Sequence, residues 1–312
     1  MKRAFVFPGQ GSQAPGMGKG LAEAFSAARL LFQEVDDALS QHLSRLMFDG
    51  PESDLMLTEN AQPALVAASL AVIRVLEAEA GFDAEKHIAY VAGHSLGEYS
   101  ALAAAGTLAI ADAVRLVKRR GQAMQKAVPM GTGAMAALLG LDIGIAREVA
   151  AEAAGDGVCD VANDNCPGQI VVSGSAEAVE RAVALAHARG SRPRLLPVSA
   201  PFHCSLMAPA ADVMAEALAE TRLNPPLVPV VANVTATATE DVDIIRELLV
   251  EQVTQMVRWR ETVLLFKQNE VEEVVEIGTG RVLSGLSKRI DRELTALSVG
   301  TPAETEDLMK RL

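Results

Sequence analysis

Residues 87–105 read HIAYVAGHSLGEYSALAAA, and this stretch carries the strongest evidence for a fold. The apolar run from His87 to Ala92 predicts a buried strand, and Leu96 to Ala105 predicts a helix. Between them, Gly93-His94-Ser95-Leu96-Gly97 places a serine between two glycines on a strand-to-helix turn. That is the context of a nucleophile elbow, which exposes a serine hydroxyl at the carboxyl end of a sheet strand.

The same turn also predicts a site for negative charge. The backbone amide that follows the serine, that of Leu96, points toward the reacting oxygen and can stabilise an oxyanion. The N-terminus of the following helix adds an electrostatic field that favours an anion there. For this motif alone, the alternative is an ordinary strand-to-helix turn with an incidental serine.

The composition indicates a folded protein and excludes several classes. Of the 312 residues, 50% are hydrophobic and 22% are charged, which excludes a disordered chain. The 28 basic and 40 acidic residues give a net charge of −12, so neither nucleic acid nor a membrane surface is an expected partner. The uncharged stretch Ala64–Ile73 is shorter than the ~20 residues of a membrane span. The first apolar run ends at Pro8, too early for a signal peptide.

The cysteines predict neither a disulfide framework nor a zinc site. Cys159, Cys166 and Cys204 are odd in number and have no CxxC spacing. A reducing cytoplasm is the simplest expectation for such a chain. We expect no metal.

Strands and helices alternate along most of the chain, which predicts an α/β fold with a parallel sheet. The strands are expected at Ala4–Phe7, His87–Ala92, Val228–Asn233, Val271–Ile277 and Ala296–Val299. The helices are expected at Leu21–Leu39, Gln62–Ala80, Leu96–Ala105, Asp112–Ala127, Leu206–Glu220, Asp241–Gln252 and Val282–Ile290.

A different pattern interrupts this alternation at residues 129–198. The predicted elements are Ala134–Leu139, Ile143–Ala154, Val158–Ala162, Gln169–Ser173, Ala176–Ala188 and Arg192–Val198. Their order is β-α-β-β-α-β, which is that of a ferredoxin-like unit. We therefore expect a large domain built from residues 1–128 and 199–312, with a small inserted domain at 129–198.

A serine nucleophile needs a base, and His203 is the best candidate. It lies in a loop between a predicted strand and helix, where catalytic residues of α/β folds concentrate, and it follows Ser95 in chain order. Its alternative role is a helix-capping or buried histidine. His94 is adjacent to Ser95 on a tight turn and is expected to point away from it. Cys204 is interpreted as a buried thiol because no elbow supports a nucleophile there.

Two further features bear on ligands. Gly9-Gln10-Gly11-Ser12-Gln13-Ala14 follows a strand and fits the dinucleotide pattern G-x-G-x-x-A, but residues 30–37 continue a helix where a second strand with an acidic residue is required. This loop could instead aim Gln10 at a ligand. Arg120 is expected on the sheet-facing side of its helix, where a guanidinium needs a carboxylate from the protein or from a substrate.

Several motifs together resemble the malonyl-CoA:acyl-carrier-protein transacylase family. They are Phe7-Pro8-Gly9-Gln10-Gly11-Ser12-Gln13, Gly93-His94-Ser95-Leu96-Gly97-Glu98-Tyr99, Arg120-Gly121 and Pro201-Phe202-His203. The resemblance extends to Gln252, Trp259 and Gly278-Thr279-Gly280, so it covers essentially the whole chain. Gly-Pro-Gly is common at the last motif, and we expect the difference to change only a turn.

The resemblance implies a large α/β-hydrolase-like domain and a malonyltransferase activity without a cofactor. Ser95 would take the malonyl group from malonyl-CoA as an ester, with His203 as base and then as acid. The ester would pass to the phosphopantetheine thiol of holo acyl carrier protein, supplying fatty acid synthesis. Gln10 and the Leu96 amide would form the oxyanion hole, and the main-chain carbonyl of Gln252 would orient His203.

The resemblance also implies how the substrate is selected. Arg120 would hold the free malonyl carboxylate, and acetyl would be rejected because it leaves a buried arginine unpaired. Phe202, directly before His203, resembles the residue of malonyl-selective acyltransferases. Asn165 would reach the site from the insert.

Acyl carrier proteins are acidic, so an acidic chain needs a local basic patch to bind one. The candidates are Lys118, Arg119, Arg192, Arg194, Lys288 and Arg289. We expect a cytoplasmic monomer. Two alternative functions remain: a serine hydrolase of esters or thioesters with the same elbow, and a noncatalytic dinucleotide-binding protein that uses the first glycine loop.

Overall fold

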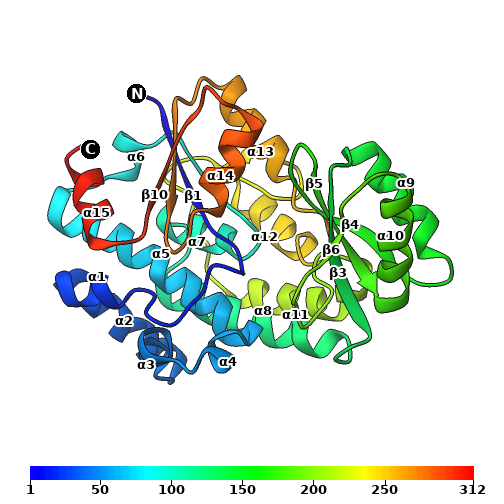
Figure 1. The fold of residues 1–312 in the computed structure, drawn as a ribbon. Coiled ribbons are helices and arrows are strands. Elements are labelled where there is room, and N and C mark those ends of the chain that lie inside the picture. The colour runs from blue at the N-terminus through cyan, green and yellow to red at the C-terminus, as the bar shows by residue number, and fades with distance from the viewer.

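The computed structural model of the chain describes residues 1–312 and contains two sheets, each flanked by helices (Figure 1). The larger sheet has the strand order β10-β9-β1-β2-β7-β8. Its strands are β1 (Arg3–Phe7), β2 (Tyr90–Gly93), β7 (Val230–Val231), β8 (Ala238–Thr239), β9 (Glu273–Ile277) and β10 (Thr295–Val299). All neighbours pair in parallel except β7 and β8, so the predicted parallel sheet is confirmed.

Thirteen α-helices accompany this sheet. They are α1 (Lys19–Ala24), α2 (Ser26–Leu39), α3 (Leu43–Asp49), α4 (Glu52–Leu55), α5 (Thr58–Ala80), α6 (Ala84–His87), α7 (Gly97–Ala104), α8 (Ile110–Ala127), α11 (Ala208–Glu220), α12 (Val242–Glu251), α13 (Trp259–Gln268), α14 (Val282–Ile290) and α15 (Pro302–Met309). A short 3-10 turn, Ser205–Met207, precedes α11.

The structure corrects two of the expected elements here and adds two others. The helix expected at Leu21–Leu39 is two helices, because Phe25 between them is extended with φ −126° and ψ 125°. The strand expected from His87 begins only at Tyr90, since His87 ends α6. The short antiparallel strand β8 and helix α13 were not predicted from the sequence.

The smaller sheet is formed by β3 (Gly133–Leu139), β4 (Cys159–Cys166), β5 (Gln169–Ser175) and β6 (Arg194–Leu195). Its order is β4-β5-β3-β6, and every pair is antiparallel. Helices α9 (Ile143–Ala154) and α10 (Ala176–Ala188) pack on its outer face (Figure 1). This is the expected β-α-β-β-α-β unit, although the strand expected at Arg192–Val198 is reduced to two residues.

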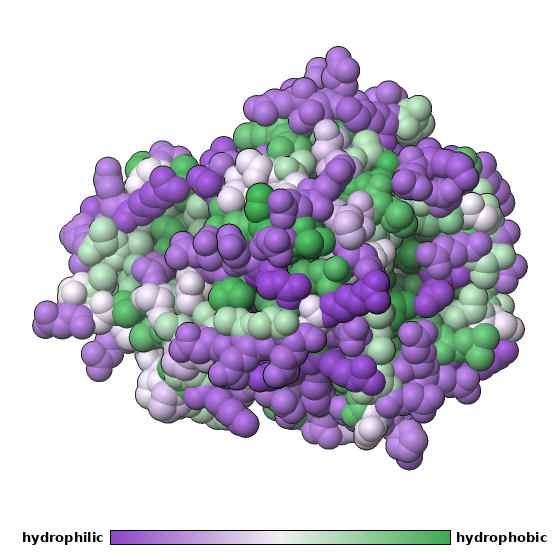
Figure 2. All heavy atoms as spheres, turned by 180° about the vertical axis from the view of Figure 1, so that it is seen from behind, coloured by the Kyte–Doolittle hydropathy of each residue, from purple (hydrophilic) through white to green (hydrophobic).

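Helix α5 lies at the centre of the main core. An 18-residue window of it has a mean hydropathy of 1.4, enough by length and composition for a membrane span, which the shorter stretch Ala64–Ile73 did not indicate. However, 83% of that window is buried inside the protein, so α5 is a core helix. The back face of the molecule is mainly hydrophilic, with apolar side chains exposed in small groups (Figure 2).

Strand β4 joins the smaller sheet to the larger unit. The backbone amide of Asp164 donates to Val257 at 3.0 Å, and that of Val257 donates to Ala162 at 2.9 Å. The fully buried carboxylate of Asp164 also pairs with Arg260 at 2.7 Å. The end of β4 is therefore held next to the large sheet, which places residue 165 beside the elbow.

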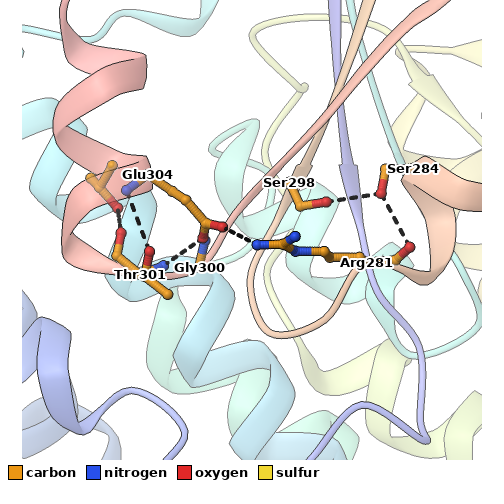
Figure 3. A network of polar contacts seen from close by, with 7 residues as sticks. Arg281, Ser284, Ser298, Gly300, Thr301 and Glu304 are labelled. Carbon is orange, nitrogen blue, oxygen red and sulfur yellow. Dashed lines mark hydrogen bonds and ion pairs between the residues drawn. The ribbon is translucent and has the colours of Figure 1, made fainter.

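The turn after β9 carries the unusual Gly278-Thr279-Gly280 motif. Both glycines have positive φ, 126° and 103°, so the turn keeps the backbone shape that glycine allows. Figure 3 shows how the adjoining segments are tied together: Arg281 pairs with Glu304 at 2.8 Å, and Ser284 bonds Ser298 at 2.8 Å. Beneath them the buried carboxylate of Glu276 accepts the first amides of α14, at 3.0 and 2.8 Å.

Candidate active site

Ser95 lies on a strained turn between β2 and α7. Its φ is +53°, a left-handed conformation that a serine adopts only where its surroundings force it. A Cβ on Gly93 would lie 1.9 Å from the carbonyl carbon of Gly97, and one on Gly97 would lie 2.3 Å from the oxygen of Phe7. Both flanking positions therefore require glycine, which is the elbow geometry that the sequence predicted.

His203 lies beside this serine although 108 residues separate them. Its Nε2 is 2.8 Å from Ser95 Oγ, and its Nδ1 is 2.8 Å from the main-chain oxygen of Gln252. A carbonyl oxygen only accepts, so Nδ1 carries the proton and Nε2 is free to accept one from the serine. Burial, and secondarily the Arg120 cation, lower the pKa of His203 to about 3. The imidazole is thus neutral at neutral pH, with Nε2 unprotonated.

Arg120, on α8, is 1% exposed and points at the same serine. Its Nη1 donates to Gln62 Oε1 at 2.9 Å, and its Nη2 donates to Gln252 Oε1 at 2.9 Å and to Ser95 Oγ at 3.1 Å. No carboxylate forms an ion pair with it, and its Nε has no partner. A buried cation held only by neutral acceptors is costly, so the site is suited to an anionic ligand beside Ser95.

The backbone amides of Leu96 and Gln10, at the elbow and in the loop that packs on it, have no acceptor within the chain. The loop that carries Gln10 packs closely on the elbow, because a Cβ on Gly9 would lie 2.8 Å from the oxygen of His94. The side chain of Gln10 turns away and donates weakly to Thr58 at 3.4 Å. The backbone of Gln10, and not its side chain, is therefore free to bind an oxyanion.

Asn165 and Phe202 lie near the site without reaching Ser95. Asn165 Oδ1 accepts a hydrogen bond from His94 Nε2 at 2.9 Å, so the insert contacts the residue next to the serine. His94 also packs against Trp259, with 5.7 Å between the ring centroids. Phe202 is half-buried and packs against both the main core and a small cluster of the insert.

Sequence reasoning missed three polar side chains of the site: Gln62, Glu98 and Asn233. Asn233 Oδ1 accepts the Ser95 amide at 2.7 Å, and its Nδ2 donates to the Gly93 oxygen at 2.6 Å. The signal was its place at the carboxyl end of a predicted strand, where sites of parallel sheets form. Glu98, within the GHSLGEY motif, is 2% exposed, and burial raises its pKa to about 7.

The structure also bears on the alternatives. About 20 residues after the first glycine loop the chain is in α2, so the second strand of a dinucleotide site is absent. Cys204 is a buried thiol whose pKa is raised by burial.

The basic residues considered for carrier-protein docking differ in their pairing. Lys118 pairs with Glu59, and Arg119 pairs with Glu216. Arg192, Arg194 and Lys288 are exposed and form no ion pair, whereas Arg289 bonds Gln169 at 2.6 Å.

Comparison with known proteins fits this geometry. Residues 4–293 match the acyl transferase domain family. The malonyl CoA-acyl carrier protein transacylase of Escherichia coli (strain K12) is 47% identical over 301 residues, 96% of each chain. The acyl-carrier-protein S-malonyltransferase structure from Bartonella henselae superposes with a TM-score of 0.97 at 54% identity, covering 100% of this chain and 99% of that one.

A further related structure shows a malonyl-transacylase in complex with a type II PKS acyl-carrier protein. It superposes with a TM-score of 0.96 at 43% identity and covers 100% of both chains. The family match, the full-length relatives and the superposed structures all cover both the large unit and the insert. The chain therefore belongs to the acyl transferase domain family, in which its full-length relatives are malonyl CoA-acyl carrier protein transacylases.

Proposed function

We propose that the protein transfers a malonyl group from malonyl-CoA to the phosphopantetheine thiol of acyl carrier protein, supplying fatty acid synthesis through a Ser95 acyl-enzyme. One observation carries the proposal. The buried guanidinium of Arg120 lies 3.1 Å from the serine hydroxyl and has no carboxylate partner within the protein. A substrate with a carboxylate near its thioester would supply that partner.

In the first half-reaction, His203 Nε2 removes the Ser95 hydroxyl proton while Oγ attacks the thioester carbonyl of malonyl-CoA. The carbonyl oxygen becomes an oxyanion, which the backbone amides of Leu96 and Gln10 stabilise by donating hydrogen bonds. When the intermediate collapses, the C–S bond breaks and the proton on Nε2 passes to the departing sulfur. Coenzyme A leaves as the thiol, and the malonyl group remains as a serine ester.

The second half-reaction reverses these roles. The phosphopantetheine thiol gives its proton to His203 Nε2 and attacks the ester carbonyl, again with the oxyanion at the two amides. The C–O bond to Ser95 then breaks, and the serine oxygen takes the proton back. The main-chain carbonyl of Gln252 holds the imidazole through Nδ1 in both halves. It does so in place of the acidic member of a serine-histidine-aspartate triad.

Selectivity arises from Arg120 and its two glutamine supports. Gln62 and Gln252 each accept a hydrogen bond from one terminal nitrogen of Arg120. These two bonds orient the guanidinium toward the acyl chain on Ser95. Acetyl would occupy the same ester position and leave the cation unpaired. Asn165 acts through His94, which it holds by a hydrogen bond, and Phe202 limits the width of the acyl site from the insert side.

The wider setting follows from the same features. The exposed Arg192, Arg194 and Lys288 form the docking patch for the acidic carrier protein. The three cysteines are free and buried, and we place the protein in a reducing cytoplasm. Residues 129–198 act as one inserted domain that forms a wall of the site.

Intact-protein mass spectrometry tests the function. Wild type mixed with malonyl-CoA and no acceptor is expected to gain one malonyl group, and Ser95→Ala is expected to gain none. Acetyl-CoA is expected to load wild type less. Release of free malonate without an adduct would favour the hydrolase. Binding of NAD or NADP, with no reaction toward malonyl-CoA, would favour the dinucleotide-binding alternative.

A further inference from the structure

Glu98 is the one buried carboxylate next to the reacting residues, and the mechanism above does not use it. It lies in the first turn of α7, where the helix N-terminus favours a negative charge. Its Oε2 accepts Gln252 Nε2 at 2.8 Å and the Asn233 amide at 3.1 Å. Both donors belong to residues that themselves touch Ser95.

The side-chain amide of Gln252 lies between two groups of opposite hydrogen-bonding character. Arg120 can only donate, and an ionised Glu98 can only accept. One orientation satisfies both: Oε1 faces Arg120 Nη2 at 2.9 Å, and Nε2 faces Glu98 at 2.8 Å. In the reversed orientation, two donors would face each other at Arg120 and two acceptors at Glu98.

We propose that Glu98 is a positioning residue for malonyl recognition: its carboxylate sets the orientation of the Gln252 amide, which holds Arg120 in line with the acyl group on Ser95. This inference rests on the proposed function and extends it by one residue. Glu98 does not touch the substrate. Its effect passes through Gln252, so it should act on the malonyl carboxylate more than on the chemistry of acyl transfer.

Protonation of Glu98 weakens the constraint, because a carboxylic acid carries an O–H that can donate to Gln252 Oε1. Only Arg120 Nη2 and the main-chain oxygen of Ser95, which accepts Gln252 Nε2 at 3.0 Å, then favour the observed orientation. Burial raises the pKa of Glu98 to about 7, against the smaller opposing effects of the hydrogen bonds from Gln252 and Asn233 and of the Arg120 charge. Of the other ionisable groups that face this site, Arg120 remains a cation, and burial lowers the pKa of His94. Burial also raises the pKa of Tyr99 far above its ordinary value and lowers that of His203 to about 3. Neither of them titrates near neutral pH.

The expected pH dependence follows from these values. As the pH falls through about 7, Glu98 takes up a proton and kcat/KM for malonyl loading decreases. The profile of kcat/KM reports groups of the free enzyme, so the break belongs to the unliganded site. In Glu98→Gln the break disappears, because the amide does not titrate.

The test measures loading kinetics with malonyl-CoA and acetyl-CoA for wild type, Glu98→Gln and Glu276→Gln between pH 5.5 and 8.5. For Glu98→Gln at pH 8 we expect kcat/KM for malonyl-CoA to fall about 10-fold, mainly through KM, and that for acetyl-CoA to fall much less. Glu276→Gln is the matched control, since Glu276 is also a buried glutamate that accepts two backbone amides, at the start of α14. It should lose stability and keep both the malonyl preference and the break near pH 7.

Two results would overturn the inference: a Glu98→Gln enzyme that keeps the break and the wild-type ratio of malonyl to acetyl loading, or one that loses both substrates equally together with stability. If Glu98→Gln does not fold, Glu98→Asp decides, because it keeps the charge but draws it back from Gln252. A lowered malonyl-to-acetyl ratio supports the inference, and an unchanged ratio overturns it. Failure of wild type to load malonyl would instead overturn the proposed function.

Discussion

Two buried arginines of this protein, Arg3 and Arg120, have opposite surroundings. Arg3 stands on β1 directly opposite Glu273 on β9, and its Nε lies 2.5 Å from the carboxylate, which Arg311 also contacts. Arg120 is buried as deeply, with 1% exposure against 5%, but its acceptors are two glutamines and a serine. Their difference is that the protein itself supplies the carboxylate in one place and leaves it to a ligand in the other.

The comparison teaches how to separate structural from functional charges. The attraction between a buried cation and a buried anion offsets much of the cost of desolvating both, and removing one partner exposes that cost as lost stability. A buried cation without an anion carries the cost in the free protein and recovers it on binding. Arg3 should therefore act on folding, and Arg120 on substrate choice.

The largest expected effect is at Arg120. In Arg120→Ala, kcat/KM for malonyl loading should fall by about 100-fold or more, the loss that follows truncation of a buried charge partner. Acetyl loading should fall far less, because no carboxylate is involved. Arg120→Lys keeps the charge without the two-pronged geometry and should be intermediate. Equal losses for both acyl groups in a kinetic comparison would mean that Arg120 is not the carboxylate site.

The second effect is on stability at the paired arginine. Glu273→Gln should lower the free energy of unfolding by about 3 kcal/mol, because it leaves Arg3 buried without its anion. Urea unfolding followed by circular dichroism measures this, and the malonyl-to-acetyl loading ratio should stay at the wild-type value. If Glu273→Gln changed the malonyl-to-acetyl loading ratio and left the free energy of unfolding unchanged, the contrast drawn between Arg3 and Arg120 would be wrong.

The third effect is electrostatic and smaller. Arg120 is the second cause, after burial, of the low pKa of His203. Replacing Arg120 by Ala removes a nearby positive charge, so the histidine binds a proton more easily and its pKa should rise from about 3. Nuclear magnetic resonance titration of the imidazole would show the midpoint at higher pH. The Glu273→Gln protein, altered only at the distant pair, should titrate as wild type does.

The smallest effect extends the comparison to the surface. Arg194 is exposed without an ion pair, whereas Arg119 is paired with Glu216 at 3.5 Å. At low salt, Arg194→Glu should slow transfer to acyl carrier protein about 3-fold, and the difference should vanish in ~0.5 M salt because surface charges are screened. Arg119→Glu should change the rate less. Rates that do not depend on salt would exclude Arg194 from the docking surface.

Much of the fold followed from local patterns. Helices α9, α10 and α14 begin and end where the sequence predicted, because apolar periodicity and the residues at their ends act within a few turns. The strand lengths did not follow. Strand β6 keeps two of seven expected residues, since a strand extends only as far as its neighbour β3 pairs with it.

The residues of the site show the same difference between local patterns and long-range contacts. Ser95 and its glycines were predictable because the elbow is a local turn that other residues cannot adopt, and His203 was a candidate because of its loop between a strand and a helix. Asn233, Gln62 and Glu98 were not, since each matters through partners far along the chain. Gln252 has one role of each kind. The family resemblance implied that its main-chain carbonyl orients His203, whereas only the structure revealed the contacts of its side chain.

By itself, the sequence determined the turn that exposes Ser95, because a serine flanked by glycines between a predicted strand and a predicted helix is a local pattern. Only the tertiary structure decided which arginine is free for a ligand. Arg3 and Arg120 are the same residue type, are both buried, and both follow another basic residue in the sequence. Whether a carboxylate lies opposite depends on which segments pack together, β1 on β9 in one case and α8 against α5 and the elbow in the other.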